Sequence, residues 1–454
     1  MRCKGLPDSL KIMLSIILSL GFAHEKIQAA KCPCDIYKDG GTPCVAAHST
    51  VRALFSSYNG PLYQVRRLPD TQNKKDIYPR TPGGVVNAGT QDSFLGSSRG
   101  TISIIYDQSE NANHLKSHCT GTWTPPDTEA VATDAPIKIN GYKAYGVLTY
   151  GGFSPNIGTG YRNNVTKGMP TGNPAEGMYM VASGRRYNQW CCFDYGNAES
   201  NGLCNGKATM ECIYFGNSTQ WGHGSGSGPW IMADMENGMV AGADYIDNNN
   251  TSIVPTDFVS LLLKGGGYAS TVENWYCLKA GNAQSGKLEK KYAGTRPSGY
   301  YPMKLDGAII LGIGGDNSHT GIGTFFEGAI VKGCPTDATE DSLQANIIAA
   351  GYGSNVTFTR YGGIHAVTPS MFKINYNPSN GNAVIGYALQ ETRHVSMNVF
   401  DQQGRHIALI ANSVIAAGRH EVVWNTKKIP AGVYFWRLAI DGRDGGAGRI
   451  VVGK

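Results

Sequence analysis

The stretch Trp230–Asn237, which reads WIMADMEN, is the segment of this sequence that decides the fold. Successive side chains of a β-strand point to opposite faces, so this stretch places Met232, Asp234 and Glu236 on one face. The residues between them are apolar and are expected to face a core. The alternation predicts a strand that buries one face and carries two acids on the other.

Similar short apolar runs recur from residue 31 to residue 352. Clusters of Gly, Asn, Asp and Pro separate them, and the runs include Thr101–Tyr106, Met178–Val181 and Ala308–Ile313. Helical patterns are confined to Ala46–Tyr58 and Glu340–Ala350. Many strands with few helices predict an all-β fold, and we expect residues 31–352 to form one large, jelly-roll-like β-sandwich.

The composition agrees with a secreted, β-rich protein. Glycine accounts for 60 of 454 residues and charged residues for only 16%, which is unlike a helical cytosolic protein. The net charge of +6 is spread thinly, without a run of five or more basic residues. We therefore expect no nucleic-acid partner.

The first 30 residues have the pattern of a secretory signal peptide. Arg2, Lys4 and Lys11 precede the apolar run IMLSIILSLGFA, and small residues follow before Lys31. An uncleaved membrane anchor is the alternative, but the apolar run is short for a membrane span. We therefore expect residues 1–30 to be a signal peptide and the mature chain to be exported.

Cysteine usage fits an oxidising compartment. Of the 11 cysteines, Cys3 lies in the signal peptide, which leaves an even number in the mature chain. Cys34 and Cys44 flank a short loop that we expect a disulfide to close. The cysteine spacing matches no zinc site, so no metal is expected. Other pairings stay open, with two hypotheses: Cys204 with Cys212, and Cys277 with Cys334.

Cys191 and Cys192 are adjacent, within NQWCCFDYGNAES. Most adjacent cysteines bond to two separate partners, whereas a bond between them closes a small ring that the surroundings must enforce. Aromatic and acidic residues surround this pair. They favour a vicinal disulfide that serves as a rigid platform against a sugar ring.

Three carboxylates are candidates for chemistry. Asp234 and Glu236 share a strand face, and Asp316 follows the apolar strand and glycines of AIILGIGGDN. Glycoside hydrolysis requires two carboxyl groups that flank the scissile bond. Asp234 with Glu236, or Glu236 with Asp316, would supply such a pair, and spacing alone does not choose between them. The non-catalytic interpretations are two solvent-facing acids on an outer strand and an Asp316 that caps its own turn.

Several longer segments carry a resemblance to a known family. They are PCDIYKDGGTPCVAAHSTVRAL, SIIYDQSENANHL, NGYKAYGV, CCFDYGNAE, IYFGNSTQWGHGSGSGPWIMADMEN and GAIILGIGGDNS. In this order they resemble the catalytic domain of the glycoside hydrolase family 54 α-L-arabinofuranosidases from Cys34 to about Tyr352. The resemblance implies a β-sandwich and a retaining enzyme that acts on terminal α-L-arabinofuranosyl groups.

The resemblance also implies roles for individual residues. It places the nucleophile at Glu236 and the general acid/base at Asp316, and it implies that Cys191 and Cys192 form the family's vicinal disulfide. The implied substrate-binding residues are Asp234, Asn237, Gly238, Gly315, Cys191, Cys192 and, as an aromatic wall, Trp221. It requires no cofactor and no metal, and its substrates are plant polysaccharides such as arabinan, arabinoxylan or arabinogalactan decorations.

A second β pattern follows the first domain. Residues 353–371 are polar and are expected to form a linker, and residues 372–454 alternate again, as in Val395, Met397 and Val399. This tail is predicted to be a small immunoglobulin-like β-sandwich.

The tail also resembles a known domain. The segments KINYNPSNGNAVIGYAL, VSMNVFDQQGRHI and GRIVVGK resemble the C-terminal sorting domain of type IX secretion cargo. The resemblance implies a bacterial protein, secreted or attached to the cell surface, whose tail meets an outer-membrane secretion machinery. Fungal members of family 54 carry an arabinose-binding β-trefoil there, so binding to polysaccharide surfaces is in doubt. We expect a monomer with no catalysis in the tail.

Two rival functions have weaker support. Gly96–Gly100 matches the G-x-S-x-G nucleophile elbow, which requires a strand before it and a helix after it. Here a polar loop precedes the motif and a strand is expected after it. A carbohydrate-binding protein without catalysis would keep the sandwich and the pocket. Such a protein gains nothing from a nucleophile opposite an acid, so we expect an enzyme.

Overall fold

The computed structural model describes residues 31–353 and 373–453, apart from short gaps at 69, 120, 123–125, 152–157, 205, 267–272, 378–380, 390–392, 403–404, 417 and 441–442. The expected signal peptide and nearly all of the expected linker lie outside the described residues. Buried side chains of the described part form separate hydrophobic cores within residues 34–352 and within residues 383–452. Within the described ranges, no helix is long and apolar enough for a membrane span.

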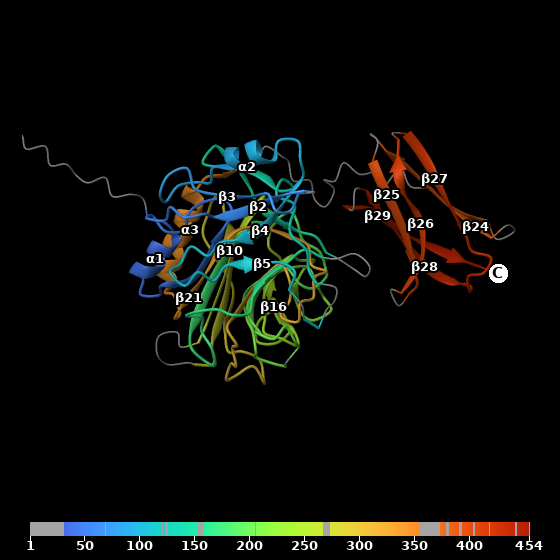
Figure 1. The fold of residues 1–454 in the computed structure, drawn as a ribbon. Coiled ribbons are helices and arrows are strands. Elements are labelled where there is room, and N and C mark those ends of the chain that lie inside the picture. Colours follow the sequence, from blue (N-terminus) through green and yellow to red (C-terminus); the bar gives the residue numbers. More distant parts are fainter. Residues whose placement is uncertain are drawn as a thin grey trace, which may run out of the picture. The chain divides into compact units, whose positions relative to one another are not determined.

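Residues 31–353 are built around two large antiparallel sheets (Figure 1), which confirms the all-β sandwich. The seven-stranded sheet contains β1 (Cys44–Ser49), β21 (Gly323–Lys332), β10 (Glu176–Ser183), β17 (Phe258–Gly265), β18 (Tyr276–Asn282) and β19 (Glu289–Gly294) in this order, with β8 (Val147–Thr149) beside β21.

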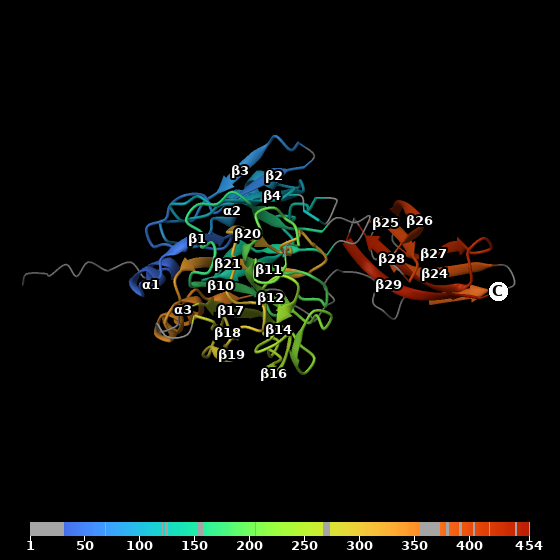
Figure 2. The same ribbon diagram turned by 90° about the horizontal axis from the view of Figure 1, so that it is seen from below.

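The ten-stranded sheet carries the segment WIMADMEN. Its order is β15 (Met239–Val240), β14 (Trp230–Asp234), β12 (Glu211–Gly216), β11 (Asp194–Ala198), β20 (Ala308–Leu311), β9 (Tyr161–Asn163), β5 (Leu115–Lys116), β4 (Gly100–Ile105), β2 (Tyr63–Arg67) and β3 (Lys74–Ile77). Figure 2 shows β20, β11, β12 and β14 as successive neighbours.

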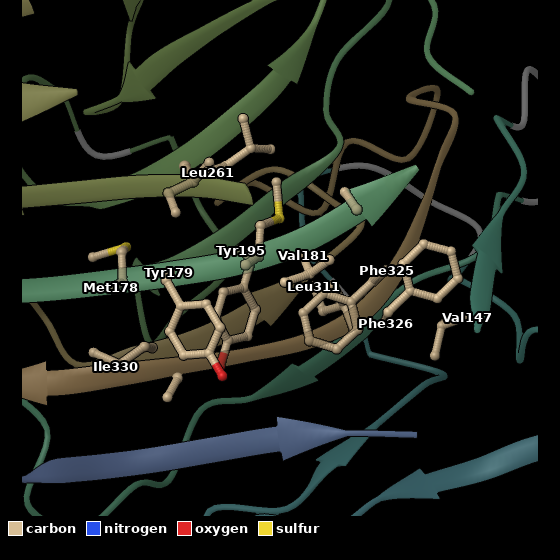
Figure 3. Close-up of a cluster of buried hydrophobic side chains, with 14 of the residues drawn as sticks. Val147, Met178, Tyr179, Val181, Tyr195, Leu261, Leu311, Phe325, Phe326 and Ile330 are labelled. Atoms are coloured by element: carbon tan, nitrogen blue, oxygen red, sulfur yellow. The ribbon is translucent and has the colours of Figure 1, made fainter. Parts of the chain in front are cut away.

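The core of this domain lies where the two sheets face each other. Tyr179 and Val181 of β10 meet Tyr195 of β11 and Phe325 of β21 in one buried cluster (Figure 3). The Tyr195 and Phe325 ring centroids are 5.2 Å apart. Ile231, Ala233 and Met235 belong to the same core, as the alternation in WIMADMEN predicts.

Three helices and two small sheets complete the domain. One expected helix is confirmed, since Glu340–Ala350 falls almost entirely within α3 (Asp337–Ala349). The other is wrong, because Cys44–Ser49 pairs with β21 as a strand whose backbone groups are satisfied across the sheet. The remaining elements are α1 (Pro33–Asp39), α2 (Ala88–Leu95), a sheet of β22 (Tyr352–Gly353), β6 (Pro136–Ile139) and β7 (Tyr142–Tyr145), and a pair of β13 (His223–Ser225) and β16 (Ile246–Thr251).

The C-terminal part forms a smaller body with its own core, as predicted for a small sandwich. Val395, Met397 and Val399 are buried together with Trp436 and Leu438. One sheet contains β23 (Lys373–Asn377), β24 (Asn382–Leu389) and β27 (Gly418–Asn425), and the other β26 (His406–Ile415), β25 (Arg393–Phe400), β28 (Gly432–Ile440) and β29 (Arg443–Val452).

Two disulfides lie in the described residues. Cys34 is bonded to Cys44, as predicted, and Cys191 is bonded to Cys192. The two hypothetical pairs are wrong for this structure, since all of their cysteines are free thiols. Cys212 of one such pair is fully buried while Cys204 is exposed, so the two occupy different environments.

A buried ion pair ties β21 to the segment after β1 and to α3. The Arg52 Nε and Nη2 atoms donate to the two carboxylate oxygens of Glu327 at 2.6 Å each, and Nη1 donates to Asn346 Oδ1 at 2.9 Å. Both side chains of the ion pair are nearly inaccessible. Removal of one partner would leave the other charge buried without compensation.

We therefore expect Glu327→Ala to lower the free energy of unfolding by about 3–5 kcal/mol, measured by denaturant titration. Asp39→Ala is the matched control, because its ion pair with Lys31 is more than half exposed on both sides. The control should cost no more than about 1 kcal/mol. Equal losses in the two variants would contradict the role of the Arg52–Glu327 pair.

Candidate active site

The candidate site is a cavity of about 300 Å³. It lies over the face of β14, β12 and β11 that points away from the sandwich core, because Tyr214 and Met232 on this face belong to a separate cluster with Cys192. All nine residues predicted for the site line it: Cys191, Cys192, Trp221, Asp234, Glu236, Asn237, Gly238, Gly315 and Asp316.

Asp234 ends β14 and turns the chain into the cavity. Its Oδ1 atom accepts a hydrogen bond from the backbone N–H of Glu236 at 3.1 Å. Glu236 and Asn237 then adopt left-handed backbone conformations, with φ of 67° and 58°. The predicted strand therefore stops two residues before Glu236, since an aspartate side chain that binds the backbone two residues on favours a turn.

Asp316 reaches the same cavity from the loop after β20. Its Oδ1 atom accepts a hydrogen bond from Ser318 N at 2.9 Å, and Gly314 N donates to Ser318 O at 2.8 Å. The interpretation of Asp316 as a turn cap is thus confirmed, and the residue also lines the cavity.

Gly315 leaves room for two carboxyl groups. A Cβ atom at this position would lie 2.1 Å from Oε2 of Glu199 and 2.9 Å from Oε2 of Glu236. Both distances are below normal contact, so only glycine fits here while the two glutamates keep their positions. The missing side chain thus makes room for groups of the protein itself.

Burial dominates the electrostatics of the acids. Only 7% of Asp234 and 6% of Glu236 is exposed. Burial raises the pKa of Asp234 to about 7. Burial, and then the charge of Asp234, raises the pKa of Glu236 to about 9. Burial therefore disfavours the charged form of both acids.

The bonded sulfurs form part of the cavity wall. Cys192 Sγ lies 3.6 Å from Asp234 Oδ2, and Cys191 Sγ lies 3.5 Å from Ser318 Oγ. Cys191 and Trp221 pack against the same apolar cluster. Among the described residues, Cys191, Cys192 and Asp234 are the acidic and sulfur groups close enough together to suggest a metal. They do not fit one, because sulfurs bonded to each other offer no thiolate.

Four of the side chains that line the cavity are exposed to solvent and form its rim: Trp190, Cys204, Gln220 and Asn237. Cys204 Sγ donates to Asn237 Oδ1 at 2.8 Å, so the thiol fixes the orientation of a predicted substrate-binding amide.

Sequence reasoning missed the acids behind the cavity, Asp194 and Glu199. Both are fully buried. Thr209 donates to Oε1 of Glu199 at 2.6 Å. Arg162 donates to the backbone carbonyls of Glu199 and Gly315 and so joins two loops. The sequence did hold a signal for these two acids, because they flank the uncharged strand segment YGNA. Charged groups next to a buried strand are costly to bury, so their presence indicates a function.

Comparison with known proteins gives one family match for each of the two parts of the chain that have their own hydrophobic core. Residues 33–353 match the family model described as "Alpha-L-arabinofuranosidase B, catalytic". Residues 374–452 match the model described as "Secretion system C-terminal sorting domain". Both resemblances inferred from sequence are thereby confirmed.

Two curated fungal proteins are similar to this chain. A "Probable alpha-L-arabinofuranosidase B" of Aspergillus clavatus is 50% identical over 345 residues, which cover 74% of this chain and 66% of the relative. An "Arabinofuranosidase/B-xylosidase" of Trichoderma koningii is 52% identical, with 74% of this chain and 66% of the relative covered. The chain thus spans slightly less than two thirds of these relatives.

Solved structures agree. A crystal structure of an "arabinofuranosidase complexed with arabinofuranosyl-alpha-1,2-xylobiose" is 44% identical, with a TM-score of 0.68, and 80% of this chain and 73% of that chain are covered. A family 54 α-L-arabinofuranosidase soaked with a cyclic sulfate inhibitor gives the same values. A secretion-system C-terminal sorting domain follows the catalytic domain of this chain. The chain therefore belongs to the family of α-L-arabinofuranosidase B catalytic domains.

Proposed function

We propose that this protein is a retaining, exo-acting α-L-arabinofuranosidase that removes terminal α-L-arabinofuranosyl groups from plant arabinan, arabinoxylan or related polysaccharides. The observation that carries the proposal is that Glu236 and Asp316, from separate segments, line one cavity of about 300 Å³. The names of relatives that are 50% and 52% identical over the aligned residues support the same substrate class.

Glu236 is the proposed nucleophile. Its ionised carboxylate attacks the anomeric carbon of the arabinofuranosyl group, and the glycosidic bond breaks as a covalent glycosyl-enzyme forms. Burial, and then the charge of Asp234, raises the pKa of Glu236, but the positive charge that develops on the sugar in the transition state stabilises its ionised form.

Asp316 is the proposed general acid/base. It transfers a proton to the departing glycosidic oxygen, and as a carboxylate it then accepts a proton from the water that attacks the anomeric carbon. The second step releases arabinose and regenerates both carboxyl groups. Asp316 is less buried than Glu236, which suits a group that exchanges protons with water.

The remaining predicted residues are proposed to hold the sugar. Asp234 accepts hydrogen bonds from sugar hydroxyls, while the Cys191–Cys192 disulfide and Trp221 supply apolar walls. Asn237, Gly238 and Gly315 complete the subsite. No metal or other cofactor takes part in this proposal.

The sorting domain supports a location outside the cell. We propose that a bacterial outer-membrane secretion machinery recognises residues 372–454 and exports the enzyme, as a monomer, to the medium or the cell surface. The proposed catalytic residues all belong to residues 31–352. The tail is therefore proposed to direct export and to take no part in catalysis.

Glu236→Gln should reduce the release of 4-nitrophenol from 4-nitrophenyl α-L-arabinofuranoside by at least about 10³-fold, because an amide cannot form the glycosyl-enzyme. Glu289→Gln is the control, since this glutamate lies on an exposed strand position away from the cavity. Circular dichroism should show that both variants fold. Turnover by Glu236→Gln at the level of the control would remove Glu236 from its proposed role.

Asp316→Ala should lose the basic limb of the pH–rate profile, because no group remains to protonate the leaving oxygen. With an aryl substrate whose leaving group needs no proton, azide should restore turnover and yield arabinofuranosyl azide. Product analysis by NMR would also report the anomeric configuration, and an inverted product would contradict a retaining mechanism. An unchanged pH profile would contradict the role of Asp316.

Digestion of arabinan, arabinoxylan and arabinogalactan by the purified enzyme should release free arabinose as the sole sugar. An exo-acting enzyme takes single terminal residues, whereas an endo-acting one gives oligosaccharides. Chromatography of the products distinguishes the two. Release of longer fragments, or binding without release, would favour a different enzyme or a carbohydrate-binding protein.

A further inference from the structure

Asp194 is a buried acid behind the candidate site for which the mechanism above has no use. It begins β11, no part of it is accessible, and among the described residues no N–H or O–H group donates to either of its carboxyl oxygens. The polar group that meets it is the carboxyl group of Asp234, which lies across β12 on the same face of the sheet.

Charge around Asp194 is not compensated. The titratable neighbours are Cys212 and Tyr214 on β12, Asp234 and Glu236 at the end of β14, and Asp316 after β20. Glu199 is a further acid that acts on Asp234. Arg162, whose charge acts on Glu199 and Cys212, donates to the backbone carbonyls of Glu199 and Gly315 and not to these carboxylates. Full ionisation would bury several negative charges without a partner, so some of these acids must hold protons.

The hydrogen bonds decide where one proton resides. Asp234 already accepts the backbone N–H of Glu236 at 3.1 Å, which favours its ionised form. Asp194 accepts no such bond, so its ionised form has no support. The pKa shifts of the two acids differ in the same sense: burial, and then Asp234, holds the pKa of Asp194 well above its usual range. Burial also raises the pKa of Asp234, to about 7, but the hydrogen bonds with the Glu236 backbone and with Asp194 oppose this rise.

We propose that Asp194 is a positioning residue, a neutral carboxylic acid whose O–H donates to the carboxylate of Asp234. This bond keeps Asp234 ionised and fixes its orientation, so that its free lone pairs face the cavity. That these lone pairs then accept sugar hydroxyls rests on the proposed function, whereas the proton on Asp194 does not. In a pocket with little access to water, such a fixed acceptor needs no reorganisation when the sugar enters.

Two variants of Asp194 separate this role from a structural one. Asp194→Asn keeps an N–H donor toward Asp234 and changes no charge, so the acid limb of kcat/KM should stay at its wild-type pH. Asp194→Ala removes the donor, so the pKa of Asp234 should rise, measured by infrared titration of its carboxyl band in the protein without substrate.

Glu176→Gln is the control. Glu176 is also fully buried and also has a raised pKa, caused by burial and then by Glu211, but it lies on β10 and does not line the cavity. Its variant should leave the acid limb in place even if it destabilises the fold. Thermal unfolding of all variants reports that cost separately.

A limb that moves to lower pH in Asp194→Asn would overturn the proposal, because it would mean that the wild-type residue is ionised. An unchanged pKa of Asp234 in Asp194→Ala would overturn it as well. Infrared spectroscopy at neutral pH provides the test that needs no activity and no alanine variant. Asp194→Asn should lose one carbonyl band of a protonated carboxylic acid, and persistence of every such band would refute the proton on Asp194.

Discussion

The hydrogen bond from the Glu236 backbone N–H to Asp234 Oδ1 is the interaction on which the candidate site depends. It stops β14, admits the left-handed backbone at Glu236, and so directs an acid from a regular sheet into a cavity. A non-glycine residue at such φ is costly, and it persists only where the surroundings determine it. Here Tyr300 donates from its hydroxyl to the Glu236 carbonyl at 3.0 Å, which holds the turn from the other side.

The fold separates two demands that oppose each other. The inner face of β14, β12 and β11 packs into the apolar core, whereas the outer face gathers acids whose burial destabilises the molecule. Because the strands are shared, the packing of one face into the core holds the acids of the other face in place. The buried Arg52–Glu327 pair fulfils a similar role elsewhere, since it joins β21 to distant segments through bidentate geometry.

Much of this arrangement could be predicted from sequence, because alternation in WIMADMEN assigns Ile231 and Ala233 to the core without knowledge of the partner strands. The helix expected at Ala46–Tyr58 was wrong, since pairing with β21 outweighs local propensity. The turn at Glu236 and the acids Asp194 and Glu199 were not foreseen, because they depend on contacts between β11, β12 and β14. The choice of Glu236 and Asp316 over other pairs came from the family resemblance and not from spacing.

Gly315 has a consequence for how this site can vary. The space that its missing side chain leaves is filled by oxygens of Glu199 and Glu236, so the three positions form one steric unit. An alanine at 315 requires the carboxyl groups of both glutamates to move, and a shorter residue at 199 leaves a void unless 315 grows. The effects of substitutions here will therefore be strongly non-additive, and an evolutionary path that alters one of the three positions must pass through the others in a restricted order.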